Sequence, residues 1–175
     1  MDYVYLAILF ILSGFFMKLS DDEYDENNNL ILATFFGVLC ALTCAIASVS
    51  DASAAYIFIA IAIGNLLAFK IDGIHHIVTL VIFVAICFTC GIPQLSIIVL
   101  LILILAALSD EWGHELIYNY TENNLIILFF EYRFVTKIVI FVLALCGAFS
   151  FWTFIFFILF EVSYTMAGVV FKKVE

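Results

Sequence analysis

Three short segments of this sequence gather residues that can hold a metal ion or a phosphate group. They read MKLSDDEYDE at 17–26, AFKIDGIHH at 68–76 and AALSDEWGHE at 106–115. Each segment places an Asp four residues before another potential ligand, a spacing that puts both side chains on one face of a helix about one turn apart. The candidate metal ligands are Asp21, Asp22, Asp25, Asp72, His75, His76, Asp110, Glu111, His114 and Glu115.

The mixture of carboxylates and imidazoles leaves the metal open. Mg²⁺ prefers oxygen ligands and commonly bridges carboxylates to substrate phosphates, so the Asp-rich first segment favours Mg²⁺. Imidazole ligands shift the preference toward Mn²⁺, Fe or Zn²⁺. The expected cofactor is therefore a divalent metal, with Mg²⁺ first and Mn²⁺ or Zn²⁺ as alternatives.

Four residues are candidates for a direct catalytic role. His76 or His114 would coordinate the metal or act as a general base. Lys18 and Lys70 precede the first two clusters in the chain and would stabilise developing charge on a phosphate. The competing interpretation is structural, because membrane helices commonly end in charged residues and an acidic run is commonly a solvated connector.

Two polar residues outside the three segments are also candidates. Asn65 lies about a turn and a half before Lys70, where it would either line the same pocket or bridge two helices. Glu161 lies near the middle of an apolar run. An ionised carboxylate is costly there, so Glu161 is expected to be protonated, to be paired, or to face a polar cavity.

The elements that position these residues must be membrane helices. Hydrophobic residues make up 67% of the chain and charged residues 12%, and the mean hydropathy is +1.25. A soluble domain covers itself with more polar side chains than this. Helices satisfy their own backbone hydrogen bonds in lipid, and the apolar runs lack the alternation of a β-barrel strand. We therefore expect residues 1–175 to form one all-α integral membrane domain.

The apolar runs predict about seven spans, with six as the alternative. They are placed at 3–19, 30–49, 53–70, 74–91, 94–109, 134–149 and 151–171. Residues 116–133 would form an interfacial helix or the beginning of one long tilted span. Asp51 is expected to cap the third span. The beginning of the chain lacks the basic region of a removable signal peptide, so the first span is expected to be retained.

The basic residues predict the orientation. Lys18, Lys70, Arg133, Lys137, Lys172 and Lys173 all fall near one set of span ends. By the positive-inside rule that side is cytoplasmic, which places the N-terminus outside and the C-terminus inside. The expected location is the plasma membrane, with the functional face cytoplasmic.

The five cysteines lie inside apolar runs, where a secreted disulfide framework would not place them. Cys87 and Cys90 form a CxxC pair, but a quinone-dependent thiol enzyme needs a second exchanging pair, so packing is the favoured role. Asn119-Tyr120-Thr121 matches a glycosylation sequon on the side predicted to be cytoplasmic, and we discount it.

Two short stretches resemble known enzyme families. Asp21-Asp22-Glu23-Tyr24-Asp25 resembles the DDxxD box with which UbiA-type membrane prenyltransferases hold a lipid diphosphate through Mg²⁺. The run from Asn65 to Asp72-Gly73-Ile74-His75 is similar to the Asn and Asp-Gly segment of polyprenyl-phosphate sugar-phosphate transferases. Neither resemblance covers more than about a dozen residues. Both imply a metal-dependent reaction of a lipid phosphate at the cytoplasmic face.

The sequence therefore favours a metal-dependent membrane enzyme, a transferase or hydrolase, that acts on a phosphorylated or diphosphorylated lipid of isoprenoid type. The expected partners are membrane lipid and a lipid phosphate or diphosphate substrate, without nucleic acid, and a homodimer is compatible with the small residues of the spans. A cation or proton transporter that uses the same acids and Glu161 is the first alternative. A non-catalytic membrane subunit with partner-binding acidic loops is the second.

Overall fold

The computed structural model describes residues 3–174, and Met1, Asp2 and Glu175 lie outside the described part. The described chain is all-helical, which confirms the prediction of an all-α fold. Its helices are α1 (Tyr3–Asp25), α2 (Leu30–Ser50), α3 (Ala52–Leu67), α4 (Ile74–Cys90), α5 (Ile97–Tyr120), α6 (Asn124–Glu131), α7 (Phe134–Leu145) and α8 (Phe151–Val174).

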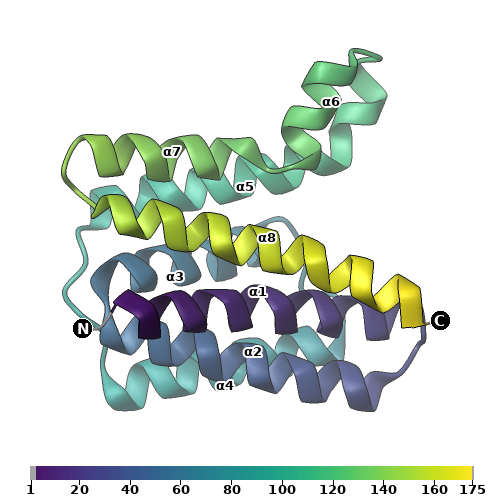
Figure 1. The fold of residues 1–175 in the computed structure, drawn as a ribbon, viewed down its shortest axis with the longest axis horizontal. Helices are drawn as coiled ribbons and strands as arrows, with labels where there is room; N and C mark the ends of the chain where they lie inside the picture. The colour runs from purple at the N-terminus through teal and green to yellow at the C-terminus, as the bar shows by residue number, and fades with distance from the viewer. Residues whose placement is uncertain (1–2, 175) are drawn as a thin grey trace.

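Seven of these helices run along one axis in alternating directions, and the short α6 projects from one end (Figure 1). The α1 helix packs between α2 and α8, and α2 also packs against α4. The α5 helix links the other side of the bundle, because it contacts α3 and α7. The two ends of the described chain lie at opposite ends of the bundle (Figure 1).

Four helices are long and apolar enough to cross a membrane, namely α1, α2, α5 and α8. The α3, α4 and α7 helices are apolar but shorter. An α7 helix of 12 residues is about 18 Å long, whereas a bilayer's hydrocarbon core is about 30 Å thick. Large apolar side chains remain exposed along the outer faces of the helices, as lipid contact requires. A helical membrane protein fits these features, with four helices of full spanning length and three shorter apolar ones among the described residues.

Two helices extend further than the hydropathy pattern indicates. The α1 helix continues through the acidic segment to Asp25 and ends at an asparagine run in which Asn28 has a φ of 51°. The side-chain oxygen of Asn29 then accepts a hydrogen bond from the backbone N–H of Leu32 and caps α2. The α5 helix continues to Tyr120, where the sequence placed its end at 109. The third polar segment therefore lies within a helix and does not follow one.

The uncertain region 116–133 divides into the last turns of α5 and the separate helix α6. Arg133, which has a φ of 49°, separates α6 from α7, so the interpretation of this region as one long tilted span is wrong. None of the residues of α6 is buried, and Leu125, Ile126 and Leu128 are exposed. An apolar, unburied helix at the polar end of the bundle has the geometry of the interfacial alternative.

Small residues allow the helices to approach closely inside the subunit. A Cβ atom built on Gly14 of α1 would lie 2.2 Å from the backbone oxygen of Phe160 in α8, so only glycine fits there. Ala41, Ala45 and Ala47 of α2 are likewise buried within the chain. These small residues therefore serve packing within one subunit, and a homodimer remains a prediction.

Asp51 caps α3, as the sequence predicted, because its carboxylate accepts the backbone N–H of Ala54 at 3.0 Å. The cap lies at the end of the bundle opposite the three polar segments, where α2 ends and α3 begins (Figure 1). The adjoining core is apolar and rich in phenylalanine, including Phe10, Phe58 and Phe157.

Candidate functional site

A cavity of about 390 Å³ lies between the helices and has a polar end and an apolar end. The polar end is lined by Lys18, Asp21, Asp25, Asn65, Lys70, Asp72, His76, Asp110, Glu111, His114, Arg133, Glu161 and Tyr164. The apolar end is lined by residues that include Cys40, Cys44, Phe58, Ile61, Phe83, Phe157 and Phe160. The three polar segments of the sequence therefore meet around one cavity.

Most of the residues singled out from the sequence line this cavity, and three do not. Asp22, His75 and Glu115 are absent from its wall. His75 nevertheless lies directly beside the lining residue His76, with the two ring centroids 3.9 Å apart. Of the two roles considered for Asn65, the structure supports the lining of the pocket.

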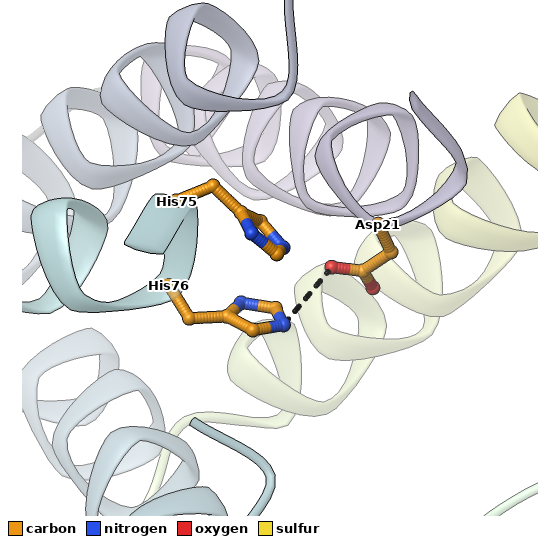
Figure 2. A group of neighbouring side chains, drawn as sticks. All are labelled: Asp21, His75 and His76. Carbon is orange, nitrogen blue, oxygen red and sulfur yellow. Dashed lines mark ion pairs between the residues drawn. The ribbon is translucent and has the colours of Figure 1, made fainter. Parts of the chain in front are cut away.

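Asp21, His75 and His76 form the group best arranged for a metal ion. One ligand atom from each of the three residues lies within 4.8 Å of the other two. Figure 2 shows both imidazoles extending from the beginning of α4 toward the carboxylate of Asp21 in the last turns of α1, with a dashed line to His76 Nε2 at 4.0 Å. Ligand atoms on one tetrahedral Zn²⁺ lie roughly 3.4 Å apart, so a modest closure of the group would complete such a site.

The setting of His75 is unusual for a histidine of a membrane protein. Its side chain is buried, at 1% exposure, and neither ring nitrogen has a hydrogen-bond partner among the described residues. The ring of Tyr24 stacks on the imidazole, with the centroids 4.2 Å apart. The His76 ring also lies against it, with the centroids 3.9 Å apart, and a Cβ built on Gly73 would lie 2.4 Å from His75 Cε1 and 2.5 Å from Nδ1. The neighbours therefore fix the ring, while neither nitrogen is used in a hydrogen bond among the described residues.

Asp21 is oriented by a residue that the sequence interpretation missed. The hydroxyl of Tyr164 in α8 donates to Asp21 Oδ2 at 3.1 Å, while Oδ1 faces His76. The ammonium group of Lys18 lies 5.4 Å from the centroid of the Tyr164 ring. No sequence signal identified Tyr164, because 143 residues separate it from Asp21.

Asp72 lies in the loop before α4, so it does not share a helix face with His76 as the spacing predicted. Its Oδ1 is nevertheless 3.9 Å from His76 Nε2, the nitrogen that also faces Asp21. The Asp72 side chain is 76% exposed. It can therefore supply a further oxygen to an ion held by the first three residues.

Asp22 is turned away from this group and is paired. Lys18 Nζ lies 2.8 Å from Asp22 Oδ1, one helical turn apart on α1. Gly168 of α8 packs on the same pair, since an added Cβ would lie 2.9 Å from Lys18 Cε. This arrangement gives Asp22 a structural partner, and Lys18 is held at the polar end of the cavity.

Asp110 serves as the N-terminal cap of α7. Its two carboxylate oxygens accept the backbone N–H groups of Val135 at 3.0 Å and Thr136 at 2.7 Å. The side chain is buried at 1% exposure. Because the first N–H groups of a helix lack partners within the helix, a buried carboxylate is well suited to this position. Asp110 therefore has a structural task that competes with the metal-ligand role predicted for it.

Glu111 is bound to Arg133, which connects α6 to α7. Arg133 Nε lies 2.9 Å from Glu111 Oε1, and Arg133 Nη2 donates to Oε2 at 3.3 Å. Burial disfavours the charge of Arg133, but Glu111, Tyr164 and Glu161 more than offset this and raise the pKa of the guanidinium above its ordinary value. The sequence interpretation used Arg133 only as a marker of orientation. In the structure it is a fixed cation in the wall of the cavity.

Glu161 is both paired and placed at the cavity. Lys137 Nζ from α7 lies 3.0 Å from Glu161 Oε2 and also donates to the backbone oxygen of Tyr132. Of the alternatives considered for this acid, the ion pair and the polar cavity both apply. Lys70 and Glu115, which were predicted as a phosphate-binding residue and a metal ligand, form an ion pair at 3.4 Å with both side chains partly exposed, so this contact adds little stability.

The charges of the polar end favour a bound cation. Asp21, Asp25, Asp72, Asp110, Glu111 and Glu161 supply six carboxylates, against the cations of Lys18, Lys70 and Arg133. Asp21, Asp25, Asp72 and Asp110 are the carboxylates in this wall that have no Lys or Arg partner within 4.0 Å among the described residues, and of these Asp110 is already bound to two backbone N–H groups. A phosphate would be repelled by this surplus of negative charge unless a metal ion accompanied it.

Comparisons with protein-family models, curated proteins and solved structures find no match to this chain.

Proposed function

We propose that this protein is a metal-dependent membrane enzyme that transfers or hydrolyses the headgroup of a phosphorylated or diphosphorylated lipid of isoprenoid type. The observation that carries the proposal is the division of one cavity into a polar end, which contains unpaired carboxylates and imidazoles, and an apolar end. A ligand that matches both ends has an anionic headgroup bound through a metal and a hydrocarbon tail.

The proposed roles follow from the contacts. Asp21, His75 and His76 hold the metal, and Asp25 and Asp72 stand beside it as further oxygen donors. Asp25 is the last residue of the segment that resembles the DDxxD box, and Asp72 is the acid of the segment that resembles the Asp-Gly segment of the sugar-phosphate transferases. A bound divalent ion would neutralise phosphate oxygens and stabilise charge on the leaving group.

The cations at the polar end would contact the phosphate directly. Lys18 and Arg133 are held in place by Asp22 and Glu111, so binding a phosphate would not require them to be ordered first. Lys70, whose pairing with Glu115 is longer and more exposed, can turn toward the headgroup. His114 lines the cavity without belonging to the metal group, which leaves it as the candidate general base.

For the membrane we propose seven spans, with α1–α5, α7 and α8 crossing and α6 lying at the interface. Lys18, Lys70, Arg133, Lys137 and Lys172 lie near the polar end of the bundle. The positive-inside rule then makes this end cytoplasmic and places the beginning of α1 outside. Cys90 and Cys146, both exposed at the opposite end, would face outside.

The transporter alternative uses the same acids but has less support. Lys137 already balances the charge of Glu161. The buried side chains of Phe58, Phe157 and Phe160 line the apolar end of the cavity, where a cation path would need polar groups. An apolar end of this kind suits a lipid tail better than an ion.

The test measures turnover in membrane vesicles of both orientations from cells that produce the protein. Labelled farnesyl diphosphate and a polyprenyl phosphate serve as substrates. In inside-out vesicles, external EDTA should abolish consumption of the lipid and an added divalent metal should restore it. In right-side-out vesicles the added lipid should not be consumed, because its charged headgroup cannot cross the membrane to the cytoplasmic face, and a membrane-impermeant maleimide should label Cys90 and Cys146.

Vesicles from cells that produce the Asp21→Asn variant supply the background, because the amide keeps the size of the side chain and removes its charge. No consumption above this background in either orientation would contradict the enzyme and favour the non-catalytic subunit. Inhibition by EDTA only on the face where Cys90 is labelled would contradict the proposed orientation.

A further inference from the structure

His75 is a buried polar side chain whose hydrogen-bonding capacity is unused among the described residues. A buried polar group without a hydrogen-bond partner destabilises the folded protein, and His75 has two such ring nitrogens. The ring cannot turn easily toward another partner, because Tyr24 and Gly73 enclose it. A metal ion would give the imidazole the partner that the protein does not provide.

The donor set around His75 contains two nitrogens and one carboxylate. Mg²⁺ takes oxygen ligands and is seldom held by imidazole. Catalytic Zn²⁺ sites, in contrast, use three protein ligands from His and carboxylates and keep one position for water or substrate. Two imidazoles and a carboxylate with open positions also suit Fe²⁺.

We infer that Asp21, His75 and His76 form an open three-ligand site for a first-row transition metal of the Zn²⁺ type, and not for Mg²⁺. The inference deepens the proposed function, on which it rests for the identity of the site, and it replaces Mg²⁺ as the first expectation from the sequence. Asp72 and the cavity lie beside His76, so a water molecule or a phosphate oxygen would complete the site from this side.

Tyr164 is the positioning residue of this site. Its hydrogen bond to Asp21 Oδ2 leaves Oδ1 directed toward His76, and Lys18 packs over its ring. Partners of this kind orient metal ligands, and their loss typically weakens metal binding about 10–100-fold. Tyr164→Phe removes the donor and keeps the ring.

The test is a metal titration of the purified protein after its metals have been stripped. Co²⁺ serves as a coloured substitute for Zn²⁺, and no lipid is added. We expect one equivalent of Co²⁺ to bind with visible absorption bands, to be displaced by Zn²⁺, and to resist a thousandfold excess of Mg²⁺. His76→Gln should weaken Co²⁺ binding more than 100-fold and Tyr164→Phe about 10–100-fold.

His114→Gln is the matched control, because His114 lines the same cavity but lies outside the three-residue group. Its Co²⁺ affinity and spectrum should equal those of the wild type. Displacement of Co²⁺ by equimolar Mg²⁺, or equal losses in His114→Gln and His76→Gln, would overturn the inference.

The titration tests the metal site and the turnover assay tests the enzyme, so either hypothesis can be refuted without the other. Turnover that Mg²⁺ alone supports, with no binding of Co²⁺, would refute the transition-metal site and leave the enzyme standing. Binding of Co²⁺ at the three residues, with no turnover of any lipid phosphate, would support the site and refute the proposed enzyme.

Discussion

Asp110→Ala is expected to lower the thermal unfolding midpoint of the detergent-solubilised protein by about 6–12 °C, the shift that a loss of about 3 kcal/mol causes in a chain of this size. The substitution removes both acceptors for the backbone N–H groups of Val135 and Thr136. These groups are then left at the buried beginning of α7 without a partner. The midpoint can be followed by tryptophan fluorescence or by size-exclusion chromatography of heated samples.

Two further variants serve as an intermediate case and as a control for this measurement. Asp110→Asn keeps one carbonyl acceptor, so its midpoint should fall between those of the wild type and Asp110→Ala. Ser109→Ala changes an exposed neighbour that donates only to its own helix, and it should leave the midpoint unchanged. If Asp110→Ala melted like the wild type but lost its bound metal, Asp110 would be a ligand and the capping role would be secondary.

Asp21→Asn is expected to reduce kcat/KM for the lipid phosphate by about 10³-fold, which corresponds to about 4 kcal/mol of lost transition-state stabilisation. The amide oxygen can still accept the hydrogen bond from Tyr164, so the local structure should persist. The variant loses the one charged ligand of the three-residue group. Steady-state turnover in detergent, with the metal held in excess, measures the change.

Asp51→Asn provides the matched control at the opposite end of the bundle. Asparagine is as good a helix cap as aspartate, so the cap on Ala54 is kept while the net charge changes by the same amount. This variant should retain wild-type kcat/KM. Comparable activity of Asp21→Asn and the wild type would remove Asp21 from the reaction.

The sequence was sufficient to predict the class of the fold and the neighbourhood of the site. Long apolar runs can only be membrane helices, and the alternation of helix direction brings the ends of alternate helices together. The segments at 17–26, 68–76 and 106–115 were therefore expected near one another, and the structure places them around one cavity. Local capping was also predictable, as Asp51 illustrates.

The partners of individual side chains were not predictable, because they come from distant parts of the chain. The backbone groups that Asp110 caps lie 25 and 26 residues away. Tyr164, which orients Asp21, comes from the last helix. Spacing within a segment cannot distinguish a carboxylate that is free for a metal, such as Asp21, from a paired one, such as Asp22.

Helix ends were also misjudged where polar residues continue a helix. Hydropathy placed the end of the fifth span at 109, but α5 continues to Tyr120. Asp110, Glu111 and Ile117 are buried on its continuing inner face. Hydropathy could not indicate this, because the buried face of the added turns contains two acidic residues whose partners come from the connection to α7 and the beginning of that helix.

Anomalous X-ray scattering from crystals grown with Zn²⁺ would locate the metal and show whether the segments at 17–26 and 68–76 build one metal centre. We predict one strong peak at the zinc absorption edge, between the carboxylate of Asp21 and the imidazoles of His75 and His76. A peak beside Asp110 and Glu111, or well-ordered crystals soaked in Zn²⁺ without a peak at the three residues, would contradict it.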